Sequence, residues 1–217
     1  RQERRMLMKK GCILCLLISV ISLPLIAQNI IYSNLKELLA QHGDTTAVLR
    51  VEKRSRNQIV LTGGADYRIT AGDDESMCRR LKKRCFAVRD EKGDLYLNCR
   101  KLRYKKLRFG AWYAPAVQLG KNIYFCAMPL GSVIGGNFVE EDDVKLGGNI
   151  GDALAASSLV TKRVCYELNG ETGKVDFLGK DKMLQLLKNY PELKQAYLKD
   201  DSQEAKHTFK YLLEIGR

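Results

Sequence analysis

The sequence predicts an α+β fold, in which antiparallel β-hairpins form a sheet and C-terminal helices pack on it. Apolar and polar residues alternate in pairs of segments separated by short turns, which is the period-2 pattern of half-buried strands. From Asp181 onward the apolar residues recur at the spacing of helices instead. A sheet with one apolar face and helices with one apolar stripe bury both by packing as two layers.

The first 27 residues have the pattern of a leader. Two lysines after Met8 precede an apolar stretch of 16 residues, 11–26, and Ala27-Gln28 follows, which is the order of zones in a signal peptide. A retained transmembrane anchor is the alternative, but the stretch contains Pro24 and is shorter than the ~20 residues of a spanning helix. We therefore expect residues 1–27 to be an upstream extension and a signal peptide cleaved near Ala27-Gln28. The mature protein would then have no transmembrane helix and would reside in the periplasm or on the outer surface.

Residues 28–217 are expected to form a single domain. They carry 32 Lys and Arg against 24 Asp and Glu, a net charge of +8. A chain of this length buries roughly 70% of the surface that its unfolded form exposes, so no second core is needed. The pattern divides it into a β-rich segment 45–130, a glycine-rich segment 131–160, a hairpin 163–178 and helices 181–215.

A short helix and three strands are predicted before the first hairpin. Asn34 can cap a helix over residues 35–41, in which leucines recur at helical spacing. Strands are expected at 48–52, 58–62 and 67–70, which are separated by residues 54–57 and by the Gly63-Gly64 break.

The first hairpin is expected to turn at Lys92-Gly93. A two-residue turn there places Asp90 opposite Leu95, Val88 opposite Leu97 and Phe86 opposite Cys99. These apolar residues would share one buried face, and Cys85 would point to the other.

Two further hairpins are expected along the chain. The second pairs 111–117 with 123–128 across Gly120-Lys121-Asn122, and the third pairs 164–168 with 175–177 across residues 169–174.

The C-terminal helices have separate start signals. Met183, Leu187 and their neighbours form an apolar stripe, and Pro191 stands at a position that helix starts tolerate. Asp201 followed by Glu204 has the spacing of a capping box for the last helix. We expect these helices to cover the sheet; a helical hairpin that binds a partner is the alternative.

Five cysteines remain after the leader: Cys78, Cys85, Cys99, Cys126 and Cys165. They form no CxxC pair and no Cys/His spacing typical of a metal site, so no metal is expected. An oxidising compartment would permit disulfides. We nevertheless favour buried free thiols over a bridge, because five cysteines are far from a disulfide framework.

Positive charge is concentrated between residues 78 and 108. This segment has thirteen Lys and Arg against three Asp and Glu, a balance of +10. A patch of this kind attracts polyanions, and an exported protein would meet anionic lipid or glycan surfaces, or an envelope protein, rather than nucleic acid. A solvated rim that aids solubility is the equally weighted alternative. The candidate contacts are Arg79, Arg80, Lys82, Lys83, Arg84, Arg100, Lys101, Arg103, Lys105 and Lys106.

The aromatic residues around the end of this segment, and a separate acidic run further along the chain, have simpler explanations than ligand binding. Tyr104, Phe109, Trp112 and Tyr113 are expected to be core or hairpin-edge residues rather than a stacking platform. The acidic run 140–143 lacks the alternating ligands and turn glycine of a calcium loop, so a solvated loop is favoured.

Catalysis finds little support in the sequence. His42 and His207 are the two histidines, and no GxSxG, GxxxxGK[ST] or HExxH motif is present. No catalytic residue and no cofactor are predicted. We expect a non-catalytic binding module; the alternative is a small envelope hydrolase acting on glycan or peptide, because glycosidase carboxylates leave no short signature.

Several stretches resemble a known family. These are Leu95-Tyr-Leu-Asn-Cys99, Phe109-Gly-Ala-Trp-Tyr-Ala114, the segment 164–175, Met183-Leu-Gln-Leu-Leu187 and Tyr190-Pro-Glu-Leu193. Together with the leader they are similar to a family of uncharacterised exported proteins of Bacteroidota, a domain of unknown function. The resemblance implies a location in the periplasm or on the outer surface, and it brings no activity, cofactor or catalytic residue with it.

Overall fold

The computed structural model describes residues 28–46, 49–62, 64–105, 107–128, 163–200 and 205–217. Its strands are β1 (Asn29–Tyr32), β2 (Asp44–Thr46), β3 (Arg50–Lys53), β4 (Tyr67–Thr70), β5 (Ala87–Arg89), β6 (Leu95–Asn98), β7 (Arg103–Tyr104), β8 (Leu107–Arg108), β9 (Tyr113–Leu119), β10 (Asn122–Ala127), β11 (Val164–Leu168) and β12 (Val175–Phe177). Among these described residues, ten strands form one sheet in the order β12-β11-β10-β9-β6-β5-β1-β2, and β3 joins it through β4, which pairs with β9. All pairings are antiparallel, and β7 and β8 form a separate ribbon.

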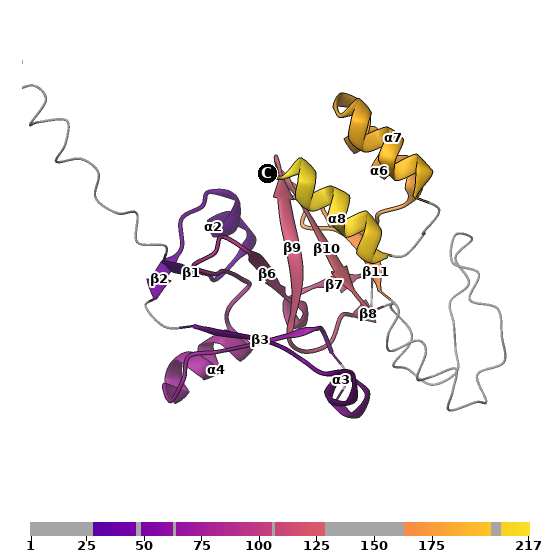
Figure 1. Ribbon diagram of the computed structural model, residues 1–217. Coiled ribbons are helices and arrows are strands. Elements are labelled where there is room, and N and C mark those ends of the chain that lie inside the picture. The colour runs from indigo at the N-terminus through magenta and orange to yellow at the C-terminus, as the bar shows by residue number, and fades with distance from the viewer. Residues whose placement is uncertain (1–27, 47–48, 63, 106, 129–162, 201–204) are drawn as a thin grey trace, which may run out of the picture.

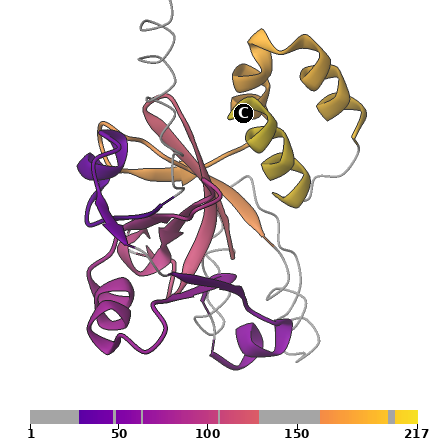
Figure 2. The same cartoon turned by 60° about the vertical axis from the view of Figure 1, so that its left-hand side comes forward.

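The helices lie at several places around the sheet. They are α2 (Leu35–Leu39), α3 (Arg56–Thr62), α4 (Glu75–Lys83), α6 (Lys180–Leu186), α7 (Pro191–Lys199) and α8 (Ala205–Ile215), with short 3₁₀ helices η1 (Cys99–Lys101) and η2 (Leu187–Asn189). α6, α7 and α8 lie together near β9, β10 and β11, whereas α4 lies at the opposite end of the molecule near β3 (Figures 1 and 2). The predicted α+β fold, with helices packed on an antiparallel sheet, is confirmed.

Both faces of the central strands are buried. On one face, Phe109, Phe125 and Tyr166 pack with ring centroids 4.8–5.3 Å apart in the largest cluster; Phe125 and Tyr166 are stacked, and Phe109 meets both edge-on. The other face is covered in two places. Val88 and Tyr96 pack there with Leu81 from α4, and Tyr124 packs with residues of α6, η2 and α8. Burial on both sides means that alternation alone cannot tell which residues of a central strand share a face.

The third hairpin matches the prediction, and the second is present with a two-residue turn in place of the expected Gly120-Lys121-Asn122. In β9–β10, Leu119 pairs with Asn122, so Gly120-Lys121 form the turn. In β11–β12, Tyr166 pairs with Phe177 and Leu168 with Val175, as the alternation indicates.

The predicted register of the first hairpin is wrong by one residue. Ala87 pairs with Leu97 and Arg89 with Leu95, and the loop contains the five residues Asp90–Asp94. The buried Asp90 carboxylate accepts the backbone N–H groups of Lys92 and Asp94, at 3.0 and 2.9 Å, and so stabilises the longer loop. Val88 therefore lies in the cluster beside α4, not with Leu97 as expected. The expectations that Cys99 is buried and that Cys85 lies on the opposite face are confirmed.

The predicted strand at 58–62 is wrong, because these residues belong to α3. The Ser55 N–H donates to Gln58 Oε1 at 2.9 Å, and the Gln58 N–H donates to Ser55 Oγ at 3.3 Å. This reciprocal pair is a capping box, and it favours a helix over the strand that the apolar residues alone suggest.

Helix α4 was not predicted, although its start signal is present in the sequence. The Asp74 side chain accepts the Met77 N–H at 2.9 Å as an N-cap. The basic residues in its last turn complement the negative end of the helix dipole.

The remaining N-terminal elements agree with expectation where they are described. The helix at 35–41 is present as α2 and is capped by Asn34, which accepts the Glu37 N–H. The strand at 67–70 is confirmed, and β3 covers the predicted strand at 48–52 with a shift toward Lys53.

Other predicted features lie outside the described residues. These are the leader, the glycine-rich segment with the acidic run 140–143, Lys106, and the capping box of Asp201 and Glu204.

Candidate functional site

The candidate site is built where α4, β4 and the start of β9 meet. Asn98, at the end of β6, is only 1% exposed, and its amide nitrogen donates to the carbonyl oxygens of Leu81 and Cys85 at 3.1 and 2.9 Å. The Tyr113 hydroxyl donates to the same Leu81 carbonyl at 2.8 Å. Two donor groups thus make three hydrogen bonds that hold the end of α4 against the residues that lead into η1 and β9.

A cavity of about 170 Å³ opens beside this junction. Its charged lining residues are all basic: Arg68 from β4, Lys82 from α4 and Arg100 from η1. The other lining residues are Ile69, Thr70, Cys78, Asn98, Ala111, Trp112 and Tyr113. Because none of these lining residues is acidic, the cavity is suited to an anion.

Trp112 forms an aromatic wall of the cavity. The guanidinium carbons of Arg54 and Arg68 lie 5.2 and 5.6 Å from its ring centroid, which is the distance of cation–π contacts. Trp112 adopts a positive φ of 74°, which is rare for a bulky residue. Its carbonyl accepts the Cys99 N–H at 2.9 Å, so the unusual backbone is tied to the neighbouring strand end.

Arg54 is held in place by the backbone beneath the Trp112 ring. It is 7% exposed and donates to the carbonyl oxygens of Ala65 and Gln58 at 2.7 and 2.9 Å. Burial lowers the pKa of Arg54, and Asp66 partly offsets this effect, but an arginine remains charged at neutral pH.

The polar groups at the junction stay protonated. Burial raises the pKa of the Tyr113 hydroxyl, and the neighbouring Cys85 adds to this effect. Burial also raises the pKa of the Cys85 thiol to about 11. Tyr113 therefore acts as a hydrogen-bond donor to α4. Neither group is a nucleophile at neutral pH.

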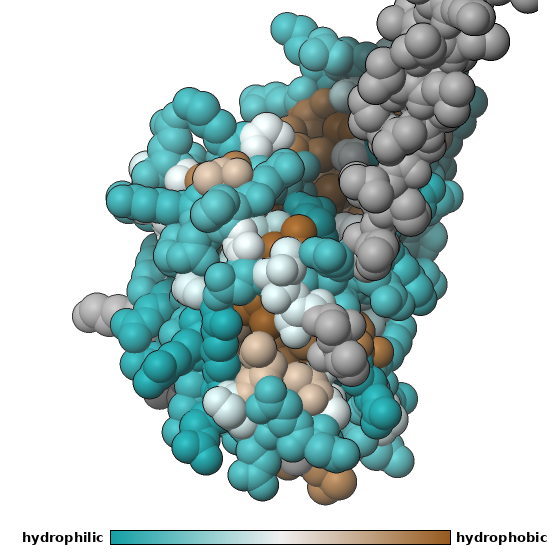
Figure 3. Space-filling view, turned by 90° about the vertical axis from the view of Figure 1, so that its left-hand side faces the viewer, coloured by the Kyte–Doolittle hydropathy of each residue, from teal (hydrophilic) through white to brown (hydrophobic). Residues whose placement is uncertain are grey.

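The structure separates the ten predicted contact residues. Lys82 and Arg100 line the cavity, and Arg79, Lys83, Arg84 and Lys101 are exposed on or directly after the same two helices. Arg80 instead forms an ion pair with Asp44 of β2. On this side of the molecule hydrophilic residues cover most of the surface, and hydrophobic ones show in the gaps between them (Figure 3).

The ribbon of β7 and β8 carries Arg103 and Lys105, whereas Lys106 lies outside the described residues. In the ribbon, Arg103 pairs with Arg108, and Lys105 directly follows β7. The Lys105 ammonium lies 5.2 Å from the Tyr104 ring, which packs on Phe177 of β12 with centroids 4.9 Å apart. The basic residues are therefore spread over α4, η1 and the ribbon, and the ribbon contacts both β12 and η1.

Sequence reasoning missed Arg68 and Asn98 and assigned Trp112 to the core or a hairpin edge. Phe109 and Tyr113 are buried as predicted, whereas Trp112 is half-buried in the cavity wall. Arg68 stands 32 residues before Arg100 in the chain. It reaches the cavity because β4 pairs with β9, and nothing local in the sequence indicates this.

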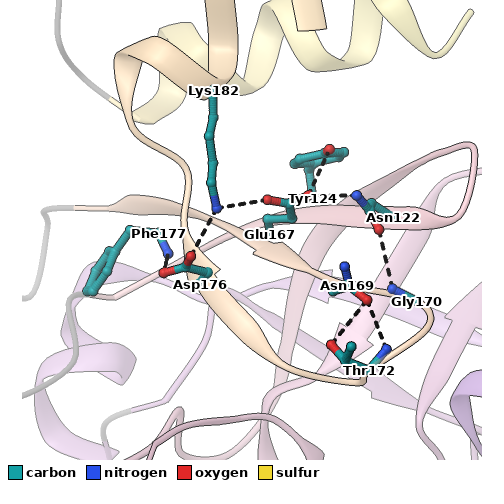
Figure 4. A network of polar contacts seen from close by, with 9 residues as sticks. All are labelled: Asn122, Tyr124, Glu167, Asn169, Gly170, Thr172, Asp176, Phe177 and Lys182. Atoms are coloured by element: carbon teal, nitrogen blue, oxygen red, sulfur yellow. Dashed lines mark hydrogen bonds and ion pairs between the residues drawn. The ribbon is translucent and has the colours of Figure 1, made fainter. Parts of the chain in front are cut away.

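A second polar network lies on β10–β12 and connects the sheet to α6 (Figure 4). Lys182 Nζ is 3.1 Å from Glu167 Oε2 and 3.0 Å from Asp176 Oδ2. Asn122 and Tyr124 donate to Glu167 Oε1 at 2.6 and 3.3 Å. Glu167 and Asp176 are opposite each other in the β11–β12 register, so they are the facing carboxylates that a hydrolase would require.

Lys182 makes this carboxylate pair unsuitable for acid catalysis. Its hydrogen bond lowers the pKa of Asp176, partly offset by burial. Burial by itself lowers the pKa of Lys182, but hydrogen bonds to Asp176 and Glu167 outweigh it, and the net change is upward. A general acid of a glycosidase needs a raised carboxyl pKa, so the network is better explained as the attachment of α6.

The described residues contain neither a cluster of metal ligands nor a helix suited to spanning a membrane. No group of three or more His, Cys, Asp or Glu side chains is placed to hold a metal ion there. In the same part of the chain, no helix combines the length and apolar character needed to cross a membrane.

Comparison with known proteins gives a family but no characterised relative. The model of a family of unknown function, DUF6563, matches residues 30–217. No curated protein and no solved structure matches the chain. The resemblance to an uncharacterised family is confirmed to this extent, and its occurrence in Bacteroidota and the export of its members stay predictions. Since the match spans most of the sequence, this chain belongs to the DUF6563 family.

Proposed function

We propose that this protein is an exported, non-catalytic binding module that holds an anionic group of an envelope lipid or glycan in the cavity beside α4. The observation that carries the proposal is the convergence of Arg68, Lys82 and Arg100 on one cavity whose lining contains no carboxylate. These cations come from three separate elements, so their proximity is a property of the fold and not of one basic run.

The size of the cavity favours a single charged group as the ligand. At about 170 Å³ it is smaller than the ~300–1,000 Å³ of sites that enclose a whole drug-sized molecule. A phosphate, sulfate or carboxylate fits this description, with the rest of the lipid or glycan remaining outside. The exposed Arg79, Lys83 and Lys101 nearby would add attraction to a charged surface, worth ~1 kcal/mol for each residue.

The Trp112 ring in the cavity wall favours a ligand in which the anionic group is attached to a larger, partly apolar group. A sugar or other flat apolar surface attached to the anion could pack on the Trp112 ring, whose contacts with Arg54 and Arg68 fix its orientation.

The leader supports export. The lysines after Met8 and the apolar stretch 11–26 have the order of a signal peptide. Amino-terminal sequencing of the protein recovered from the periplasm or the medium tests this: a first residue at or next to Gln28 is expected, and an uncleaved chain in the cytoplasm would contradict it.

Binding is tested with purified residues 28–217, neutral and anionic vesicles, and neutral and acidic glycans. We expect retention on at least one anionic surface, weaker at ~0.5 M than at ~0.05 M salt because salt screens exposed charges. The vesicle and glycan arms distinguish the two sources of the anion.

Two double variants separate the cavity from net charge. Lys82→Glu with Arg100→Glu should weaken binding at least ~30-fold, since each lost cation costs ~1 kcal/mol. Lys188→Glu with Lys199→Glu changes the net charge equally at exposed sites on η2 and α7 and should leave binding nearly unchanged. Equal losses in both variants, or no retention of the parent protein, would overturn the proposal.

A further inference from the structure

Two buried cysteines lie side by side on neighbouring strands of the sheet, outside the cavity described above. Cys126 of β10 and Cys165 of β11 are direct partners in the strand register. They are 6% and 4% exposed, and their sulfur atoms lie 2.6 Å apart. Leu178, Phe209 and Ala205 pack around them, so α8 covers the pair from the solvent side.

The backbone at this pair suits a covalent bond. The Leu178 N–H donates to the Cys165 carbonyl at 2.9 Å, so the backbone polar groups of Cys165 point toward the β12 side and away from β10. Cys126 and Cys165 are therefore a non-hydrogen-bonded pair, in which Cα atoms are ~4.5 Å apart and the side chains approach most closely. That spacing falls within the range found in disulfides.

We propose that Cys126 and Cys165 form a cross-strand disulfide that closes residues 126–165 into a covalent loop. The two thiols lose two protons and two electrons to the disulfide of an oxidised thiol–disulfide oxidoreductase or of oxidised glutathione. The sulfur–sulfur bond forms between the strands, and the oxidant leaves as two thiols. For this pair, the proposal replaces the buried free thiols that the sequence favours.

The other described cysteines do not offer a competing partner. Cys85 and Cys99 lie on opposite faces of the sheet, and the Cys85 thiol donates to the Ala87 carbonyl at 3.1 Å. Cys78 is half-buried beside the anion cavity, where its sulfur accepts the Ala71 N–H at 3.3 Å.

Burial determines when the bond can form. The hydrogen bond with Cys165, followed by burial, raises the pKa of the Cys126 thiol. The thiolate is the attacking species, so oxidation should be slow once α8 covers the pair and fast while the chain is still folding. The disulfide would then persist because reductants have no access to it.

The disulfide is tested with the full chain, which is refolded from denaturant in the presence of oxidised glutathione. The remaining thiols are then alkylated, and the peptides are mapped by mass spectrometry. We expect the peptides that contain Cys126 and Cys165 to be joined, and to separate after reduction. Cys126→Ala should abolish the link and leave Cys165 alkylated, whereas Cys78→Ala should preserve it.

Thermal unfolding provides a second measurement. Reduction in denaturant, followed by refolding without oxidant, should lower the Tm of the parent protein by roughly 10 °C, because a loop of about 40 residues is released, and it should leave the Tm of Cys126→Ala unchanged. Alkylation of both Cys126 and Cys165 after oxidative refolding, or a link between other cysteines, would overturn the proposal. The measurement does not depend on anion binding, so its outcome is distinct from that of the proposed function.

Discussion

Trp112 is a residue whose position needs an explanation beyond packing. Its φ of 74° places it in a backbone region that bulky residues rarely adopt. Gly64 makes this arrangement possible, since a Cβ atom there would lie 2.5 Å from the Ala111 carbonyl oxygen and 2.8 Å from Trp112 Cδ1. The surrounding structure therefore holds the ring where it contacts Arg54 and Arg68 and lines the cavity.

Asn98 is the residue on which the junction with α4 most depends. Asn98→Ala leaves the buried carbonyl of Cys85 without the donor that Asn98 provides and removes one of the two donors to Leu81. We expect a loss of about 2–4 kcal/mol in the free energy of unfolding, because each unsatisfied buried group costs about 1–3 kcal/mol. Urea unfolding at pH 7 measures this loss.

Tyr113→Phe is the matched control for that change. It removes one donor and leaves Leu81 with its bond from Asn98, so the loss should be only about 1 kcal/mol. A larger loss in Tyr113→Phe than in Asn98→Ala would contradict the role given to Asn98.

At the scale of elements, α6 is attached to the sheet by an apolar contact and an ionic one. Met183 and Leu187 pack under α8 with Tyr124 and Leu212. Lys182, next to Met183, reaches the carboxylates of β11 and β12. The apolar contact supplies most of the attachment, because ion pairs that remain partly exposed contribute little.

The ionic part of this attachment should depend on pH. Lys182 depresses the pKa of Asp176, so the contribution is present above the unfolded pKa of ~3.9 and is lost as pH falls through the lower folded value. Asp176 is mostly exposed, and Asp176→Asn should therefore cost at most ~0.5 kcal/mol at pH 7. By about pH 2–3 the difference from the parent protein should have largely disappeared.

Urea unfolding at both pH values tests this dependence. Asp73→Asn removes an equal charge at an exposed turn before α4 and provides the control. A difference between Asp176→Asn and the parent protein that is the same at both pH values would show that the ion pair is not responsible.

At the scale of the whole molecule, sequence reasoning succeeded where local chemistry determines the structure. Gly120 and Lys121 mark the turn between β9 and β10, and the alternation in β11–β12 identifies its buried face. It failed at the first hairpin because all of β6 is buried, and alternation then carries no information about register. The strand predicted at 58–62 was wrong, because the capping box of Ser55 and Gln58 starts a helix where the apolar residues alone indicate a strand.

The candidate site could be predicted only in part, for a related reason. A run of bases is visible in any sequence, and Lys82 and Arg100 were among the residues expected to bind. The cavity requires the pairing of β4 with β9, which brings Arg68 to residues more than forty positions later in the chain. Contacts of this range are set by the packing of the whole sheet, as is the distribution of the basic residues over α4, η1 and the ribbon.

Trp112 gives the most direct measurement of the central claim, because it is the one tryptophan in the chain and lines the cavity. Its emission is recorded while residues 28–217 are titrated with inorganic phosphate, sulfate, and anionic vesicles or glycans, with chloride at equal ionic strength as control. We predict a saturable change with at least one of these anions that chloride does not produce and that Lys82→Glu with Arg100→Glu abolishes. No change with any of them, or the same change in the double variant, would contradict an anion site in this cavity.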